Sequence, residues 1–244
     1  MKSNAYSALA PHYEKLITSC DYEQWSQYVY NKVNEYAPIK KGCDLACGSG
    51  YFTRYLKRQG IDIYGVDQSQ EMLLEAQSLS IKEKVPVDYQ NQDIKKFKSF
   101  EKLGFITVIN DGINYLSQSQ LQSAFKRFAS NLVKGGALIF DISSEYKLKN
   151  ILGDNLYCED RDEITYIWFN TFLGDSVKMD LTFFTKDGEK YVRSDESHVQ
   201  YIHNTEEVKN ALYNAGFDVV EISGHLGAPL TEDGHRVNFV AVKK

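Results

Sequence analysis

The chain contains 244 residues and carries a net charge of -5, from 28 Lys and Arg against 33 Asp and Glu. At roughly 150 residues per domain, this length indicates one large domain, or one domain with a small addition. A hydrophobic share of 43% excludes a disordered chain, and 16 Gly with 4 Pro exclude a collagen-like one. The acidic balance also leaves no whole-chain basic footprint for a nucleic-acid partner.

The N-terminal region is rich in aromatic side chains and predicts helical structure, and we expect neither a signal peptide nor a membrane-spanning stretch. Four cysteines are too few for a disulfide framework, so we expect a cytoplasmic protein. Cys43 and Cys47 have a spacing that suits a metal pair, but no second pair of Cys or His stands nearby. We therefore expect no metal and interpret both as small residues in and after a buried strand.

Short apolar runs then alternate with helical patterns, which predicts a parallel α/β sheet. We expect strands at residues 43–46, 61–66, 85–90, 105–110 and 137–143, and helices at residues 52–59, 70–79 and 118–132. Ser117 and Gln120 form a capping-box pair before the last helix, which should stop at Gly135.

Residues 154–203 break this alternation and predict an antiparallel insertion of three or four strands. An Asp-Gly pair at Asp187-Gly188 lies between β-rich runs, which is a strong hairpin signal. The α/β pattern then returns with a helix at residues 206–215 and strands at 217–222 and 236–242. One α/β domain, formed by residues 1–153 and 204–244, would thus contain the insertion.

A glycine loop follows the first predicted strand and precedes a helix, in the order Asp44-Leu-Ala-Cys-Gly48-Ser-Gly50. Glycines at such a turn allow the backbone to approach a ligand closely. Thr53 stands where a dinucleotide fingerprint needs a third Gly or Ala, which weakens a nicotinamide-binding interpretation. No Lys-Ser/Thr pair follows, so the loop is not a phosphate-binding P-loop.

Asp67 closes the second predicted strand. A carboxylate at this position can accept hydrogen bonds from both hydroxyls of a ribose, although a solvated Asp at a strand end is the simpler reading when the residue is taken alone. The glycine loop and Asp67 together favour a nucleoside-containing ligand.

These segments resemble the class I S-adenosylmethionine-dependent methyltransferases. The matching residues are Asp44 to Gly50, Tyr64-Gly-Val-Asp67, Gln92-Asp93-Ile94, Ile109-Asn110-Asp111 and Leu132-Val-Lys-Gly-Gly136. The resemblance implies an α/β, Rossmann-like fold: a seven-stranded, mostly parallel sheet with its last strand antiparallel and helices on both faces. It also implies S-adenosyl-L-methionine as the cofactor. The chain departs from the family at Gly104-Phe105, where many members have an aromatic-Asp pair.

The resemblance further implies a cofactor site on the loops that follow the first four strands. It assigns Asp44 to the cofactor's amino group, Gly48 and Gly50 to its methionine part, and Asp67 and Gln68 to its ribose. It assigns Met72, Asp93 and Ile94 to the adenine, and Asn110 and Asp111 to the boundary with the acceptor. Ala46 is a further cofactor-binding residue. Met72 can alternatively be an ordinary core residue, and Asp93 a helix cap.

The insertion is placed as in small-molecule N-methyltransferases such as glycine N-methyltransferase and amino-sugar N,N-dimethyltransferases. In those families the inserted sheet roofs the acceptor site, and N-terminal tyrosines help to close it. By this resemblance residues 1–40 would form a helical lid that carries Tyr6 and Tyr13, and residues 154–203 a roof.

The acceptor pocket is expected beside the segment that follows the fourth strand. We select Tyr13, Asn110, Asn114 and His198 as catalytic candidates. Glu196, His198 and Gln200 alternate along one strand and therefore share a face, which is either a solvated outer face or the one turned to the acceptor. In the second case His198 or Tyr201 faces the acceptor, and His198 can act as a base. We expect His203 and His235 at the surface, and Arg236 within reach of the pocket.

The sequence thus predicts a methyltransferase that transfers a methyl group in line to a nitrogen or oxygen of a small molecule. No Asn/Asp-Pro-Pro-aromatic motif of nucleic-acid amino methyltransferases is present, which argues against a nucleic-acid acceptor. Alternatives are a cofactor-binding module without transferase activity, a nicotinamide-dependent oxidoreductase, and an enzyme with a protein acceptor. The identity of the acceptor and the oligomeric state stay open.

Overall fold

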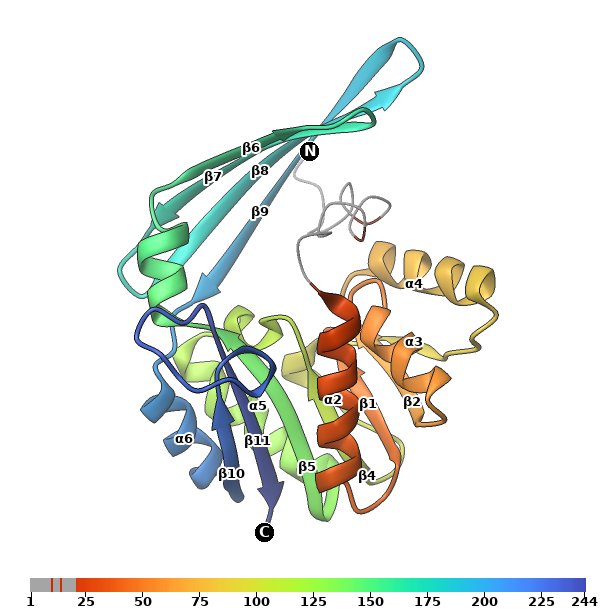
Figure 1. The fold of residues 1–244 in the computed structure, drawn as a ribbon, viewed down its shortest axis with the longest axis vertical. Coiled ribbons are helices and arrows are strands. Elements are labelled where there is room, and N and C mark those ends of the chain that lie inside the picture. The colour runs from red at the N-terminus through yellow and green to blue at the C-terminus, as the bar shows by residue number, and fades with distance from the viewer. Residues whose placement is uncertain (1–9, 11–13, 15–20) are drawn as a thin grey trace.

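A computed structural model describes Ala10, Glu14 and residues 21–244 of the chain. Its main sheet has seven strands in the order β10-β11-β5-β4-β1-β2-β3 (Figure 1). The bounds are β1 Lys41–Leu45, β2 Asp62–Asp67, β3 Tyr89–Asn91, β4 Leu103–Val108, β5 Leu132–Ser143, β10 Phe217–Ser223 and β11 Arg236–Lys243. All neighbouring pairs are parallel except the two that β11 forms, as the resemblance predicted.

Helices cover both faces of this sheet because its central strands are apolar on both sides. The helices are α2 Tyr22–Tyr36, α3 Tyr51–Arg58, α4 Gln70–Glu83, α5 Gln118–Asn131 and α6 Thr205–Asn214. Every residue of β4 is buried. Ile106 packs into one core cluster with Phe125 of α5, whereas Phe105 packs into the other with Trp25 of α2. The predicted α/β fold class is confirmed.

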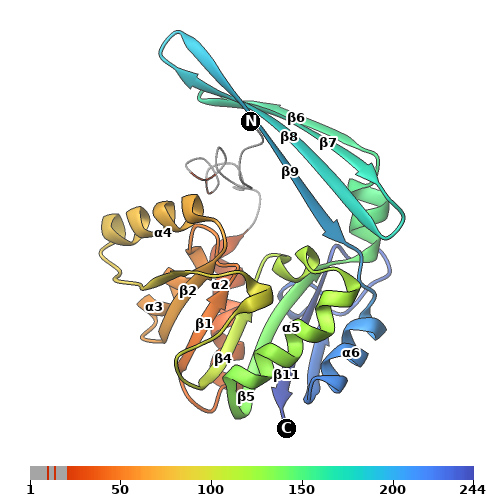
Figure 2. The ribbon, with the colours of Figure 1, turned by 180° about the vertical axis from the view of Figure 1, so that it is seen from behind.

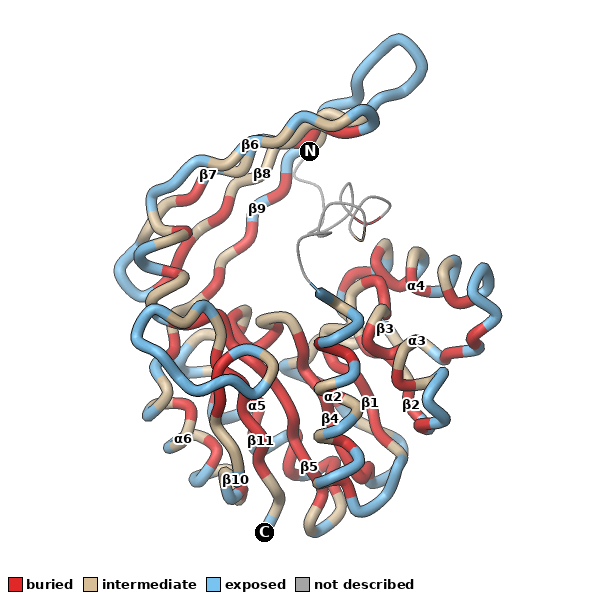
Figure 3. Tube along the Cα trace, viewed as in Figure 1, coloured by how far each residue is buried: buried red, intermediate tan, exposed pale blue. Residues whose placement is uncertain are grey.

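A second sheet of four antiparallel strands stands between β5 and α6 in the chain, in the order β6-β7-β8-β9. Its strands are β6 Leu156–Asp160, β7 Ile164–Phe172, β8 Ser176–Asp187 and β9 Lys190–Tyr201. Figures 1 and 2 show it extending over the edge at which the parallel strands end. Buried Val177 and Met179 of β8 pack on Leu148 and Leu152 of the π-helical turn η4, Lys147–Leu152. Exposed residues concentrate toward the β8–β9 hairpin end, away from this anchor (Figure 3).

Two local predictions were wrong. Gly135 does not stop α5, which ends at Asn131 and passes directly into β5; Gly135 instead lies within β5 at a φ of 75°, next to a shift in register against β4. Glycine is favoured wherever the backbone is left-handed, so the same residue type suits this irregularity in the strand and the end of a helix. The third strand is also shorter than expected, because residues 85–88, which include Pro86, lie outside it. Proline lacks the N–H that a strand ladder uses.

Candidate active site

A cavity of about 700 Å³ opens at the carboxyl ends of the parallel strands. Its lining comes from the ends of β1, β2, β3 and β4 and the loops after them, from α2, α3 and α4, from β9, and from Glu14. The members are Glu14, Tyr22, Ala46, Cys47, Gly48, Ser49, Tyr51, Phe52, Asp67, Gln68, Ser69, Gln70, Glu71, Met72, Asn91, Gln92, Ile94, Ile109, Asn110, Gly112, Tyr115, Ser197, His198 and Val199. This edge is where ligands bind in open α/β sheets.

The glycine loop and Asp67 form one hydrogen-bonded unit on this cavity. The backbone N–H of Gly48 donates to Asp67 Oδ2 at 2.9 Å, and that of Ser69 donates to Asp67 Oδ1 at 2.8 Å. Burial raises the pKa of the Asp67 carboxyl, and these backbone donors oppose that shift. Gly50 has a φ of 78°, and a Cβ there would clash with the Tyr89 side chain at its hydroxyl oxygen. The loop therefore needs glycine for both its conformation and its packing.

Asp44 lies beside this unit but does not line the cavity. Its Oδ2 accepts from Thr53 Oγ1 at 2.7 Å, and its Oδ1 accepts from Thr107 Oγ1 at 2.8 Å. Burial raises the pKa of Asp44 to about 6, against the effect of the two hydroxyl donors. Thr53, which departs from the dinucleotide pattern, thus has a defined partner in this chain.

The adenine-side candidates divide into two groups. Met72 and Ile94 line the cavity, and Met72 is 2% exposed. Asp93 is not among the lining residues: its Oδ1 accepts from the backbone N–H of Lys95 at 2.8 Å and caps the short 3₁₀ turn η2, Ile94–Lys96. Asp93 thus caps η2 in this structure, its contact with the adenine stays a prediction, and its neighbour Gln92 lies on the cavity.

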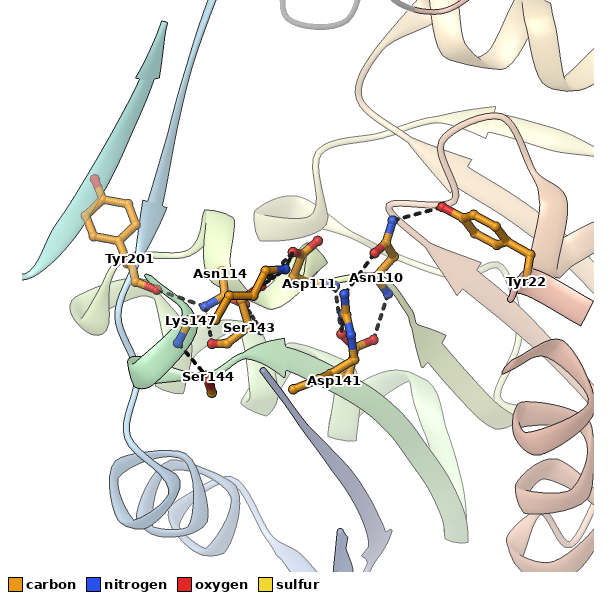
Figure 4. A network of polar contacts seen from close by, with 10 residues as sticks. Tyr22, Asn110, Asp111, Asn114, Asp141, Ser143, Ser144, Lys147 and Tyr201 are labelled. Carbon is orange, nitrogen blue, oxygen red and sulfur yellow. Dashed lines mark hydrogen bonds and ion pairs between the residues drawn. The ribbon is translucent and has the colours of Figure 1, made fainter. Parts of the chain in front are cut away.

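A buried carboxylate that the sequence analysis did not select shapes the end of β4. Asp141 of β5 accepts from the backbone N–H of Asn110 at 2.7 Å and from that of Asp111 at 2.9 Å (Figure 4). Asn110 and Asp111 have φ values of 66° and 57°, an uncommon conformation for residues other than glycine. Burial raises the pKa of the Asp141 carboxyl above its usual value, and the ion pair with Arg236 opposes this rise without cancelling it. The two backbone bonds hold the turn at the cavity.

Of Asn110 and Asp111, only Asn110 lines the cavity. Its Nδ2 donates to the Tyr22 hydroxyl at 3.3 Å, and its Oδ1 accepts from Arg236 at 3.2 Å. The Asp111 side chain instead accepts from Ser143 Oγ at 2.7 Å. Arg236 does not reach the cavity lining, contrary to expectation: it pairs with Asp141 and lies 4.3 Å from the Trp25 ring centroid.

Asn114, a catalytic candidate, occupies a supporting position rather than the cavity wall. It is fully buried in the 3₁₀ turn η3, Gly112–Tyr115. Its Nδ2 donates to the carbonyls of Ser143 and Tyr201, at 3.3 and 3.0 Å, and its Oδ1 accepts from the backbone N–H of Ser143 at 2.9 Å (Figure 4). One side chain thus joins β5 of the main sheet to the end of β9.

The alternating residues of β9 face inward. Glu196, His198 and Gln200 are 4%, 7% and 5% exposed, so the solvated-face reading is wrong. His198 lines the cavity, and its Nε2 lies 3.2 Å from Glu196 Oε2. The Tyr115 ring approaches the His198 ring edge-on at 6.3 Å. An imidazole held by a buried carboxylate therefore faces the cavity from the inserted sheet.

His203 contradicts the expectation of a surface residue. It is 1% exposed, with Nε2 2.9 Å from the Leu116 carbonyl and Nδ1 3.1 Å from Gln118 Oε1. Burial lowers its pKa. His235 is exposed, as expected. Tyr6 and the catalytic candidate Tyr13 lie outside the described residues.

Aromatic side chains form a wall that the sequence analysis did not assign to the site. Tyr22 of α2 lies 5.0 Å from Tyr51 and 5.5 Å from Phe52, between ring centroids, and all three line the cavity. Tyr51 directly follows Gly50, so its position next to the loop was available as a signal. Within the described residues, no group of three His, Cys, Asp or Glu could hold a metal ion, and no helix is long and apolar enough to cross a membrane.

Comparisons with known proteins agree with this architecture. Residues 43–136 match the family model for a methyltransferase domain. A curated relative from Geobacillus sp. (strain WCH70), named as a putative methyltransferase, is 34% identical over 98% of this chain and 99% of its own length. A crystal structure of an S-adenosylmethionine-dependent methyltransferase from Clostridium acetobutylicum ATCC 824 has a TM-score of 0.89 and 32% identity, covering 98% of this chain and 99% of that one.

The sugar N-methyltransferase KedS8 from Streptoalloteichus sp ATCC 53650 shares the fold at a TM-score of 0.79 and 19% identity, over 100% of this chain and 94% of that one. The fold, the cavity-lining glycine loop with Asp67, and these relatives define the class. The chain belongs to the class I S-adenosylmethionine-dependent methyltransferases, and its cofactor is S-adenosyl-L-methionine.

Proposed function

We propose that this enzyme methylates a nitrogen or oxygen of a small molecule bound between the main sheet and the inserted sheet. One observation carries the proposal: a single cavity is lined by the glycine loop and Asp67 on one side and by His198 of β9 on the other. In this arrangement the main sheet would hold the cofactor, and residues 154–203 would roof the acceptor.

The lining residues fit the parts of S-adenosyl-L-methionine. Asp67 accepts two backbone hydrogen bonds, one on each oxygen, and an ionised carboxylate has about four acceptor sites. It therefore retains capacity for ribose hydroxyls, with Gln68 next to it. Met72 and Ile94 offer apolar contact for the adenine, and Ala46 and Gly48 would let the backbone approach the methionine part. Gly50, which the resemblance also assigned to this part, is not among the lining residues.

When bound, the cofactor supplies a methyl group that is already strongly electrophilic. The enzyme's own contribution is then to hold the acceptor atom in line and exclude water, which can supply roughly 7–11 kcal/mol. Asn110, held in its turn by Asp141, and Tyr115 would position the acceptor. Where the attacking amine or hydroxyl carries a proton that must leave, His198 oriented by Glu196 would receive it.

Two structural neighbours support a small-molecule acceptor through what their names state. KedS8 is a sugar N-methyltransferase, and CalS10 from Micromonospora echinaspora is an amino pentose methyltransferase with S-adenosylmethionine bound. Both share the fold with this chain, and their names give a sugar and an amino pentose as what they methylate.

The test is a transfer assay with methyl-tritiated S-adenosylmethionine and a panel of small amines, amino sugars and phenols. We expect label to appear in a low-molecular-weight product together with stoichiometric S-adenosylhomocysteine. Label found only in added protein would instead indicate a protein acceptor. Cofactor binding without any transfer across the panel would indicate a cofactor-binding module.

A further inference from the structure

A fully buried arginine joins three separate segments next to the glycine loop. Arg54 of α3 is 0% exposed; it donates to the Ser49 carbonyl, to Glu14 Oε1 at 2.9 Å and to Glu83 Oε2 at 2.9 Å. A buried guanidinium is stable only when its donors are paired. Arg54 therefore fixes Glu14 of the N-terminal segment against the loop.

The two carboxylate oxygens of Glu14 differ in the hydrogen bonds that they accept. Oε1 accepts both from Arg54 and from Ser49 Oγ, the latter at 2.6 Å. Among the described residues, none donates to Oε2. Glu14 also lines the cavity, with its side chain 29% exposed. A carboxylate with an oxygen left over, held at the glycine loop, is suited to a cationic N–H donor of a ligand.

Asp44, the residue expected to contact the cofactor's amino group, lacks these properties. Both of its oxygens accept from threonine hydroxyls, it is 1% exposed, and it does not line the cavity. Of Asp44 and Glu14, only Glu14 therefore presents a carboxylate to the cavity.

We propose that Glu14, oriented by Arg54 and Ser49, binds the ammonium group of the cofactor's methionine part. This inference rests on the proposed function, which places that part of the cofactor at the glycine loop. Because Glu14 also accepts from Ser49 Oγ, binding of the cofactor and this contact between Glu14 and Ser49 favour one another.

The experiment compares two ligands by isothermal titration calorimetry. S-adenosylhomocysteine carries the amino acid part, whereas 5′-methylthioadenosine has the same adenosine and sulfur without it. Glu14→Gln keeps the size of the side chain and removes its charge. The matched control is Glu83→Gln, which also removes a carboxylate from Arg54 but lies outside the cavity lining.

We expect Glu14→Gln to weaken S-adenosylhomocysteine binding by about 10- to 100-fold, the range for losing a charge-assisted hydrogen bond. The affinity of the same variant for 5′-methylthioadenosine should change by less than about twofold. Glu83→Gln should change the affinity for either ligand by less than about twofold.

Equal weakening of both ligands by Glu14→Gln, or the same selective loss in Glu83→Gln, would show a structural role and overturn the inference. Unchanged binding in Glu14→Gln, with a selective loss in Asp44→Asn, would return the ammonium to Asp44. If the wild-type protein binds neither ligand, the proposed cofactor site itself fails, and the inference fails with it.

Discussion

Asp67 Oδ2 lies 2.9 Å from the backbone nitrogen of Gly48, so the carboxylate at the end of β2 directly holds the glycine loop that follows β1. The two elements that the sequence analysis treated as separate signals are one structural unit. A change at Asp67 should therefore affect both the ligand and the loop.

We predict that Asp67→Ala weakens S-adenosylhomocysteine and 5′-methylthioadenosine to a similar extent, by about 100-fold or more, because both ligands have the ribose and the variant lacks any acceptor for it. Calorimetry on both ligands checks this. The pattern differs from that of Glu14→Gln, which should affect only the ligand with the amino group. A loss confined to S-adenosylhomocysteine would place Asp67 at the wrong end of the cofactor.

The pKa of Asp44 leads to a stability prediction with a defined sign. Burial raises it from 3.8 to about 6, so between these pH values the folded state binds more protons than the unfolded state. Stability contributed by this group is thus highest below pH 3.8 and falls as the pH rises toward 6, by up to about 3 kcal/mol. The free energy of unfolding of wild type and of Asp44→Asn can be measured by urea titration from pH 4 to 7. As the pH rises over this range, the wild type should lose stability relative to the variant. A difference that does not vary with pH would contradict the buried, proton-binding state of Asp44.

Asn114 should matter for stability rather than for cofactor binding. Asn114→Ala removes a partner from the buried N–H and carbonyl of Ser143 and from the half-buried carbonyl of Tyr201. Leaving a buried group of this kind unpaired costs about 1–3 kcal/mol. Chemical denaturation should show a clear loss, and amide exchange in β9 should accelerate because its end loses its attachment to the main sheet. S-adenosylhomocysteine binding should stay within about twofold. Weakened binding in a fully folded variant would mean that Asn114 contacts the ligand after all.

Replacing Asn170 should not destabilise the protein, in contrast to replacing Asn114. It is 1% exposed on β7, and no residue in the described part of the chain offers a hydrogen-bond partner to either polar atom of its side-chain amide. Since an unpaired buried amide is unfavourable, Asn170→Leu should keep or raise the melting temperature. Asn131 is a matched control: its amide accepts from Ser99 and donates to Arg127, so Asn131→Leu should lower the melting temperature. Clear destabilisation by Asn170→Leu would show that its amide has a partner in solution.

The parts of the site that follow from local sequence could be predicted. The glycine loop, Asp67 and Met72 lie within one continuous segment from β1 to α4, and the glycines and the aspartate there have a direct conformational or chemical reason. The fold class followed from the same alternation of apolar and helical runs. His198 was selected because alternation along a strand places it on one face with Glu196.

Other residues depend on contacts between distant segments, which no local pattern encodes. Asp141 holds the turn at Asn110 because β5 pairs with β4, and Glu14 is held at the cavity by Arg54 of α3 and by Ser49. His203 is buried because the return from β9 brings it against Leu116, far away in sequence. Asp93 illustrates a different limit, since a cap and a ligand contact ask for the same residue type.

The most direct test of the whole account is a crystal structure of the protein with S-adenosylhomocysteine at saturating concentration. We predict the ligand in the cavity of about 700 Å³, with its ribose hydroxyls on Asp67 and its sulfur on the side facing Asn110 and His198. S-adenosylhomocysteine bound elsewhere, or this cavity left empty by it, would contradict the account.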